Sequence, residues 1–317
     1  MKKGLLSCLC ILIVFSVSAQ INIGAPGAIK PSGFKKSDME EFHTATTYFV
    51  LRESDKEQQS KIETLIRDVW KFNKFEVIDF DRYKSIANKE NSIFLGLRSY
   101  NSSRDYVSNA DLFGKYAQFT EVYIQLWRNL EVKKENHLEE QVLARIEVNL
   151  PWANYDDLKQ RISIDAFEFL CKGTVKIPEW NWGLLKNYLQ EINRCLIDNK
   201  PRWRFASDVD KTQIKNLQHE TLFVEDRIMK RLDAREKETP FENYSGKHIE
   251  ISMADLGNKI LESEATFYYM IVYLQGSDKM TTVVNSKTGE FIYSDYRGQS
   301  NFFKPKDIKA LVEKIEK

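Results

Sequence analysis

Alternating apolar and polar positions divide the chain into strands and amphipathic helices. Residues 46–51, 75–78 and 92–97 are rich in aromatic and β-branched side chains, which predicts a strand in each segment. Between the first two strands, apolar residues recur at the spacing of one helical face. These residues are Ile62, Leu65, Ile66, Val69 and Trp70.

The pattern continues with a short helix predicted over residues 81–88 and a polar loop over residues 99–109. Residues 119–127 and 141–150 are predicted to pair as a long hairpin. A further helix is expected over residues 156–170.

A similar order of elements returns in the last third of the chain. When the numbering is shifted by 174, residues 47–97 match 8 of 51 positions, among them Phe49 with Phe223 and Glu76 with Glu250. An internal duplication explains this agreement. The alternative is two α/β segments that share generic strand and helix patterns. The predicted fold class is α+β, with two similar βαβαβββα-type domains joined by a helical insert.

The helical insert carries a stripe of apolar residues that ends before Pro201 and is expected to pack the two domains together. Its members are Trp182, Leu185, Leu189, Ile192 and Leu196. The predicted organisation is a signal peptide (1–19), a flexible linker (20–42), a first α/β domain (43–170), the insert (171–215) and a second α/β domain (216–317).

The first residues have the pattern of an export signal. Lys2 and Lys3 precede an apolar run, and Val17-Ser18-Ala19 forms a small-x-small cleavage site before Gln20. An uncleaved membrane anchor is the alternative, but the run is shorter than the ~20 residues that a span needs. The leader resembles those of exported Bacteroidota proteins, which implies a Gram-negative periplasm or outer envelope and no transmembrane span in the mature chain.

Cleavage changes the charge and the cysteine content. The mature chain has 45 Lys and Arg (47 minus 2) against 46 Asp and Glu, so its near-neutral charge offers no basis for a nucleic-acid partner. Of four cysteines, Cys171 and Cys195 remain. They are candidates for a disulfide in an oxidising compartment. Two buried free thiols on separate helices are the other interpretation.

Motifs for known chemistry are missing from the sequence, which contains no phosphate-binding loop, nucleophile elbow, zinc-protease motif or Cys-x-x-Cys pair. No catalytic residue, metal ligand or cofactor is therefore predicted. His43 and His219 precede equivalent strands and could form a pair, although solvated or capping histidines explain them as well.

Aromatic and arginine residues are concentrated in the insert, and both residue types are frequent at binding hot spots. Trp182 belongs to the helical stripe and is expected in the core. The predicted binding residues are Trp180, Arg202, Trp203 and Arg204. Their alternative role is to cover the core, because tryptophan is usually highly buried.

The strand over residues 75–79, which follows an amphipathic helix, resembles accessory α/β domains of bacterial envelope-assembly proteins of the TolB amino-terminal kind. Together, the export signal, the missing catalytic motifs and the duplicated α/β pattern favour a non-enzymatic, envelope-associated protein that binds an unknown protein or polymer partner. Two alternatives are a hydrolase with a carboxylate or histidine site between the domains, and a small-ligand or glycan binder that uses Trp180 and Trp203.

Overall fold

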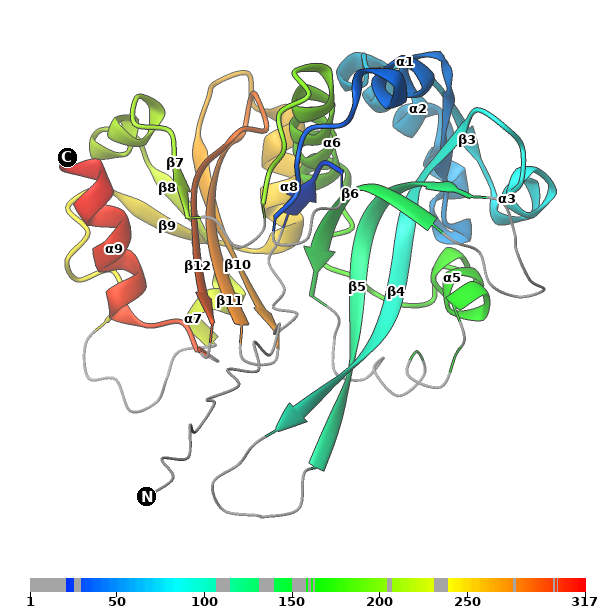
Figure 1. The fold of residues 1–317 in the computed structure, drawn as a ribbon. Helices are drawn as coiled ribbons and strands as arrows, with labels where there is room; N and C mark the ends of the chain where they lie inside the picture. The colour runs from blue at the N-terminus through cyan, green and yellow to red at the C-terminus, as the bar shows by residue number, and fades with distance from the viewer. Residues whose placement is uncertain are drawn as a thin grey trace, which may run out of the picture.

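The structure is a computed structural model with helices and two six-stranded mixed sheets, an α+β fold (Figure 1). The described residues are 21–25, 30–106, 115–130, 140–149, 158, 161, 163–203, 207–230, 239–275, 278–298, 300 and 302–317. The predicted signal peptide, residues 1–19, lies outside them.

The first sheet has the strand order β1-β6-β5-β4-β2-β3. Its strands are β1 (Ile21–Ile23), β2 (Thr46–Val50), β3 (Lys74–Ile78), β4 (Ser92–Tyr106), β5 (Lys115–Asn129) and β6 (Glu140–Val148). Strand β2 is parallel to both β3 and β4, whereas the other neighbours are antiparallel.

The second sheet repeats this plan with the order β7-β12-β11-β10-β8-β9. Its strands are β7 (Asp208–Val209), β8 (Leu222–Glu225), β9 (His248–Ile251), β10 (Tyr268–Gln275), β11 (Asp278–Asn285) and β12 (Phe291–Gly298). Here β8 is parallel to β9 and β10, so each strand has a counterpart of the same direction in the first sheet.

The pairing registers of the parallel strands can be compared through the offset of 174. The pair Tyr48↔Phe94 between β2 and β4 becomes Leu222↔Tyr268, which is the register between β8 and β10. The edge strand β9 is shifted by two residues relative to β3, a change that leaves each side chain on the same face of the sheet.

The helices form three layers with the sheets between them. They are α1 (Lys36–Thr44), η1 (Glu53–Gln58), α2 (Gln59–Val69), α3 (Phe80–Ile86), α5 (Ser163–Cys171), α6 (Trp182–Ile197), η3 (Gln213–Gln218), α7 (Asp226–Lys230), α8 (Met253–Glu262) and α9 (Pro305–Ile315). Helices α1, α2, α6 and α8 share one core with both sheets and are called the central helical layer. Helices α3 and α5 cover the outer face of the first sheet, and η3, α7 and α9 cover that of the second.

In each pair of corresponding helices, one lies in the central helical layer and the other on the outer face of its sheet. The helix after β2 is α2, which packs into the central core, whereas α7 after β8 packs on the outer face. Conversely, α3 after β3 lies outside, and α8 after β9 lies inside. The strands do not follow this exchange, because Ile93 and Leu95 of β4 and the residues that the offset of 174 relates to them, Phe267 just before β10 and Tyr269 within it, all belong to the central core.

Helix α6 confirms the prediction that the insert joins the two sheets. Its N-cap Asn181 accepts a hydrogen bond from Leu184 N at 3.0 Å, and its buried face belongs to the core that contains residues of both sheets. Figure 1 shows α6 and α8 between the sheets. The strands β2 and β3 and the helices α2 and α3 also form close to their predicted positions.

The flexible linker predicted for residues 20–42 is wrong where the structure describes it. Ile21 and Ile23 belong to the edge strand β1, which pairs with β6, and Met39 and Phe42 anchor α1 in the core. A three-residue strand stabilised by a distant partner leaves no periodic pattern in the sequence, and neither does a helix with only two buried residues.

The polar loop predicted over residues 99–109 is also wrong over its described part, because β4 continues to Tyr106. Seven residue pairs, from Tyr100↔Glu121 to Tyr106↔Lys115, join β4 only to β5. Neither β2 nor β6 reaches them, since their pairings end at Leu95 and Val122. Residues 100–106 and 115–121, called the ribbon, extend roughly 20 Å beyond the sheet (Figure 1).

Candidate functional site

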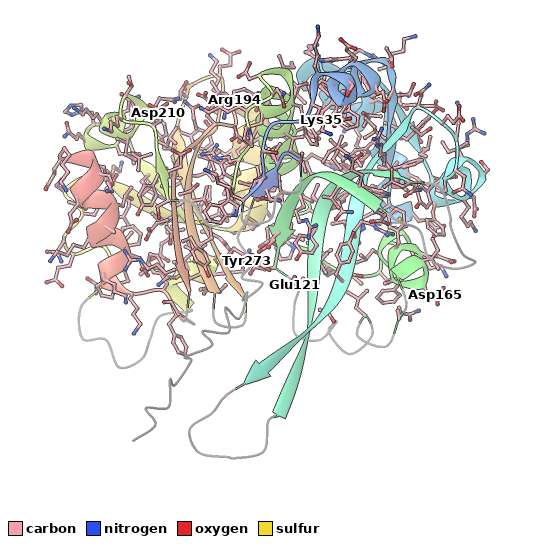
Figure 2. All side chains as sticks on the ribbon, viewed as in Figure 1. Lys35, Glu121, Asp165, Arg194, Asp210 and Tyr273 are labelled. Atoms are coloured by element: carbon pink, nitrogen blue, oxygen red, sulfur yellow. The ribbon has the colours of Figure 1, made fainter. Side chains whose placement is uncertain are left out.

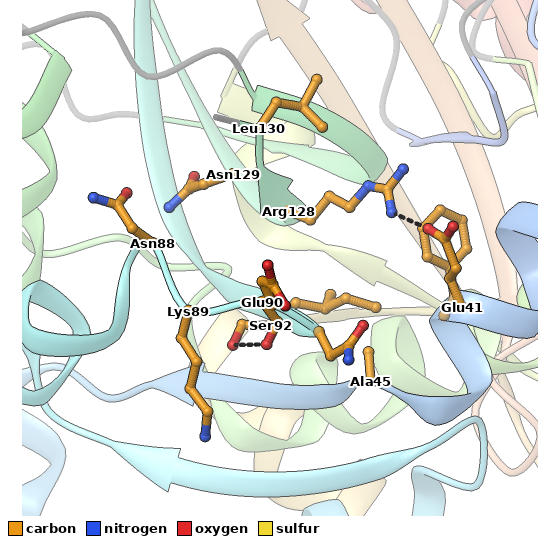
Figure 3. A pocket seen from close by; sticks show the side chains of 12 residues that line it. Glu41, Ala45, Asn88, Lys89, Glu90, Ser92, Arg128, Asn129 and Leu130 are labelled. Carbon is orange, nitrogen blue, oxygen red and sulfur yellow. Dashed lines mark hydrogen bonds and ion pairs between the residues drawn. The ribbon is translucent and has the colours of Figure 1, made fainter. Parts of the chain in front are cut away.

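A cavity of about 550 Å³ opens at the end of the first sheet opposite the ribbon (Figure 3). Its apolar surface comes from Phe42, Ala45 and Ile93, all buried, and Leu130 is 38% exposed at its edge. The polar surface comes from Asn88, Lys89, Glu90, Asn91, Arg128 and Asn129. A cavity of this size with mixed lining is suited to holding a ligand.

The cavity exists because β4 and β5 diverge at this end. Their first paired residues are Phe94 and Trp127, while Ile93 and Arg128 line the cavity. Asn129 holds β5 in place, because its side chain accepts from Trp127 Nε1 at 3.0 Å and donates to a backbone carbonyl after α3 at 2.8 Å.

The second sheet is closed at the corresponding place. Phe267 and Ser286 occupy the positions of Ile93 and Arg128, and Ser286 N donates to Phe267 O at 2.9 Å. The turn after β11 also packs on α6, where Asn187 Nδ2 donates to Ser286 O at 2.9 Å. Only the first sheet therefore carries this opening among the residues that the structure describes.

Charges around the cavity are partly compensated. Arg128 Nη1 lies 2.7 Å from Glu41 Oε2, and its guanidinium lies 5.0 Å from the centre of the Phe42 ring. Lys89 Nζ donates to the Tyr48 hydroxyl at 3.1 Å. The described lining offers both apolar contacts and hydrogen-bonding groups to a ligand.

A buried polar network at the base of the ribbon is a feature that sequence reasoning missed. Arg98, only 2% exposed, forms an ion pair with Glu140 and lies against the rings of Trp127 and Phe167 at 5.2 and 4.8 Å. Tyr100 Oη donates to Glu140 Oε2 at 2.8 Å. Burial raises the pKa of Tyr100 to about 12, and the Glu140 charge adds to this. The network anchors the ribbon to the sheet.

The predicted binding residues do not form one site. Trp180 is buried, donates to Asp55 Oδ2 at 2.9 Å and stacks on Phe49. Trp203 and Arg202 follow the far end of α6, which spans 16 residues, or roughly 24 Å. Trp203 is half-buried, and Arg204 lies outside the described residues. A glycan platform built from Trp180 and Trp203 is therefore not assembled.

Arg202 has a structural role in a cleft between α6 and the second sheet. It forms an ion pair with the fully buried Glu191, donates to Phe291 O at 2.8 Å and pairs with Ile23 of β1. Figure 2 labels Arg194 and Asp210, which line the same cleft of about 270 Å³. Both arginines are held by Glu191, so their charges serve the packing of α6 against the second sheet.

The two histidines of the hydrolase alternative are not brought together. His43 lies in the last turn of α1 in the central helical layer, and its Nδ1 lies 3.1 Å from Phe72 O. His219 follows η3, which packs on the outer face of the second sheet, and both side chains are exposed. They therefore supply no shared catalytic centre.

Cys171 and Cys195 are buried free thiols on separate helices, the second of the two interpretations that the sequence allowed. Cys171 packs in the outer cluster beside α3, whereas Cys195 belongs to the central core on the opposite face of the first sheet. The helices that carry them lie on different faces, so bridging is sterically impossible without unfolding.

Both thiols are expected to resist modification by thiol reagents in the native protein. Burial raises each pKa to about 12 from 9.0, which lowers the thiolate fraction at pH 8 roughly 1000-fold. Titration with a chromogenic disulfide at pH 8 should therefore detect neither thiol before denaturant is added. Rapid modification of either one in the folded protein would contradict this burial.

The same pKa shift sets a pH dependence of stability. Because the folded-state pKa values exceed the unfolded ones, the contribution of the two thiols is complete below pH 9 and is lost as pH rises towards 12.

The fold defines this chain as an α+β protein with two sheets of the same topology. Comparisons with models of known families, with curated proteins and with solved structures found no match. Across the described ranges, no helix combines the length and apolar character needed to cross a membrane. No cluster of three or more His, Cys, Asp or Glu side chains suits a metal ion in the same part of the chain.

Proposed function

We propose that this protein is an exported, non-enzymatic module of the bacterial cell envelope that binds a protein partner through the ribbon. The observation that carries the proposal is the seven-pair extension of β4 and β5 beyond every other described strand. A two-stranded segment is marginally stable alone in water. Such a segment is favoured when another surface covers it.

Strand addition is the physical basis for this binding. Over residues 101–106 and 115–119, the ribbon pairs with no other described strand, so its edges can present backbone N–H and C=O groups to a partner. A partner segment can pair with such an edge and gain main-chain hydrogen bonds. The Arg98–Glu140 network supports recognition because it anchors the ribbon at its base.

Shortening the ribbon tests the proposal. The variant deletes residues 101–120 and joins Tyr100 to Glu121 through Asn-Gly, the sequence preferred in two-residue hairpins. We expect at least a tenfold loss of the partner recovered from envelope extracts and a change in unfolding free energy below about 1 kcal/mol.

The matched control is Lys61→Glu on the exposed face of α2, which should bind the partner as the wild type does. Equal recovery with the shortened variant would reject the ribbon as the binding element. Loss of the fold would be seen separately in the far-UV circular dichroism spectrum.

Export is supported by the Lys-Lys start, the apolar run and the Val17-Ser18-Ala19 site. Cleavage after Ala19 removes Cys8 and Cys10. Denatured protein purified from cells should therefore contain two thiols, and a count of four would show that the leader is retained.

We also propose that the two sheets arose by internal duplication. Support comes from their common strand order, their common strand directions and the shared β2/β4 and β8/β10 register at the offset of 174. The second copy then differs in the register of β9, in the faces that its helices cover and in its shorter β10–β11 hairpin.

A further inference from the structure

We propose that the cavity between β4 and β5 binds an extended, basic peptide segment that adds to the first sheet. This second site lies at the opposite end of the hairpin from the ribbon and goes beyond the function proposed above. Three features support this site: the strands diverge, part of the lining is apolar, and Glu90 is negatively charged.

The divergence of the strands favours an extended backbone as the ligand. Ser92 and Ile93 continue β4 past its last pairing with β5, and Arg128 and Asn129 continue β5. Figure 3 shows the labelled Ser92 and Arg128 across the cavity from one another. Backbone groups near such an opening are best satisfied by another strand. In the second sheet, the bond from Ser286 N to Phe267 O closes this place from within the chain.

The lining predicts the side chains of the segment. Phe42, Ala45 and Ile93 are at most 4% exposed and provide an apolar surface inside a cavity of about 550 Å³. The side chains of an extended peptide alternate between two faces. One face of the bound segment is therefore expected to be apolar, while the other carries its polar residues.

The charges favour a basic segment. Arg128 is compensated by Glu41 at 2.7 Å, and Lys89 is directed to the Tyr48 hydroxyl at 3.1 Å. The Glu90 carboxylate makes no ion pair or hydrogen bond with the residues that the structure describes, although it lines the cavity. The carboxyl end of α1 adds partial negative charge nearby. A lysine or arginine of the ligand would compensate Glu90.

A titration followed by amide NMR tests this inference with three capped five-residue peptides. The first alternates valine and lysine, the second alternates valine and glutamate, and the third is the first with N-methylated backbone amides. We expect the basic peptide to shift the amide signals of Ile93 and Asn129 with a Kd of about 1 mM or below. The acidic peptide should bind at least tenfold more weakly, and N-methylation should abolish binding.

Charge reversal gives the decisive comparison. Glu90→Lys should reverse the preference between the basic and acidic peptides, whereas the control Glu57→Lys on the exposed η1 should leave it unchanged. No shift at Ile93 with any peptide, or an unchanged preference in Glu90→Lys, would overturn the proposal. The shortened-ribbon variant should still bind the basic peptide, so failure of one site is distinguishable from failure of the other.

Discussion

Replacing Lys279 by methionine is expected to destabilise the protein by about 3–5 kcal/mol, the range for removing one partner of a buried ion pair. Lys279 Nζ lies 2.5 Å from Asp307 Oδ2, and each residue is only 1% exposed. Lys279 also donates to Phe302 O at 2.9 Å. Burial lowers the pKa of Lys279, while the Asp307 charge acts in the opposite direction. Without the ammonium, Asp307 remains a buried carboxylate whose other cationic neighbour, Arg297 Nε, lies 3.5 Å from Oδ1.

A second substitution separates charge from packing. Asp307 Oδ2 also accepts from Lys304 N at 2.8 Å at the start of α9, and an asparagine can keep that bond. Lys279→Met combined with Asp307→Asn should therefore be more stable than Lys279→Met alone, a non-additive result for two residues in contact. Urea unfolding of the wild type, the two single variants and the double variant measures this non-additivity.

The matched control is the exposed pair of Lys172 with Glu168, whose charged atoms lie 3.2 Å apart. Lys172→Met should change the unfolding free energy by less than about 1 kcal/mol, because both partners remain solvated. An equally small effect of Lys279→Met would contradict the assignment of Lys279 and Asp307 as the charge pair that holds α9.

Gly183→Ala is expected to destabilise the protein by about 3 kcal/mol, because it forces apart the two helices that join the sheets. A Cβ atom on Gly183 of α6 would lie 2.1 Å from the backbone oxygen of Gly257 in α8. On the other side of this contact, Asn181 Nδ2 donates to Met253 O at 3.3 Å. Rigid backbone on both sides leaves no flexible side chain to move away.

Gly96→Ala provides a control at a glycine with space for a methyl group. Its Cβ would lie 3.4 Å from Val50 and 3.6 Å from Phe167, ordinary contact distances. This variant should be as stable as the wild type or slightly more stable, since alanine restricts the unfolded chain more than glycine does. Chemical denaturation compares the two variants. If Gly183→Ala is within about 0.5 kcal/mol of the wild type, the close approach of α6 and α8 is not required.

Local patterns were sufficient to predict those elements that bury a regular face. Ile62 and Ile66 give α2 its stripe, and the same kind of spacing identifies α6. The strands β2 and β10 are dominated by aromatic and β-branched residues that are buried on both faces. In these segments, the apolar periodicity and the tertiary packing require the same structure.

Elements that depend on distant partners could not be predicted. The polar residues after Arg98 resemble a loop in the sequence, yet Arg98 and Tyr100 are strand residues whose polar groups bind Glu140 of another strand. The cavity at Ile93 results from the divergence of two strands, which no local pattern encodes. Likewise, a row of exposed polar residues from Asn88 to Asn91 gives no signal of a binding site.

We propose that the ribbon contacts a protein partner in the cell envelope. Photo-crosslinking in living cells tests it most directly, with a photoreactive amino acid placed at Ser103 or Gln118, paired residues of β4 and β5. The control position is Lys61 on the exposed face of α2. We expect the same protein adduct from both ribbon positions and none from Lys61. Adducts from all three positions alike, or none from the ribbon, would contradict it.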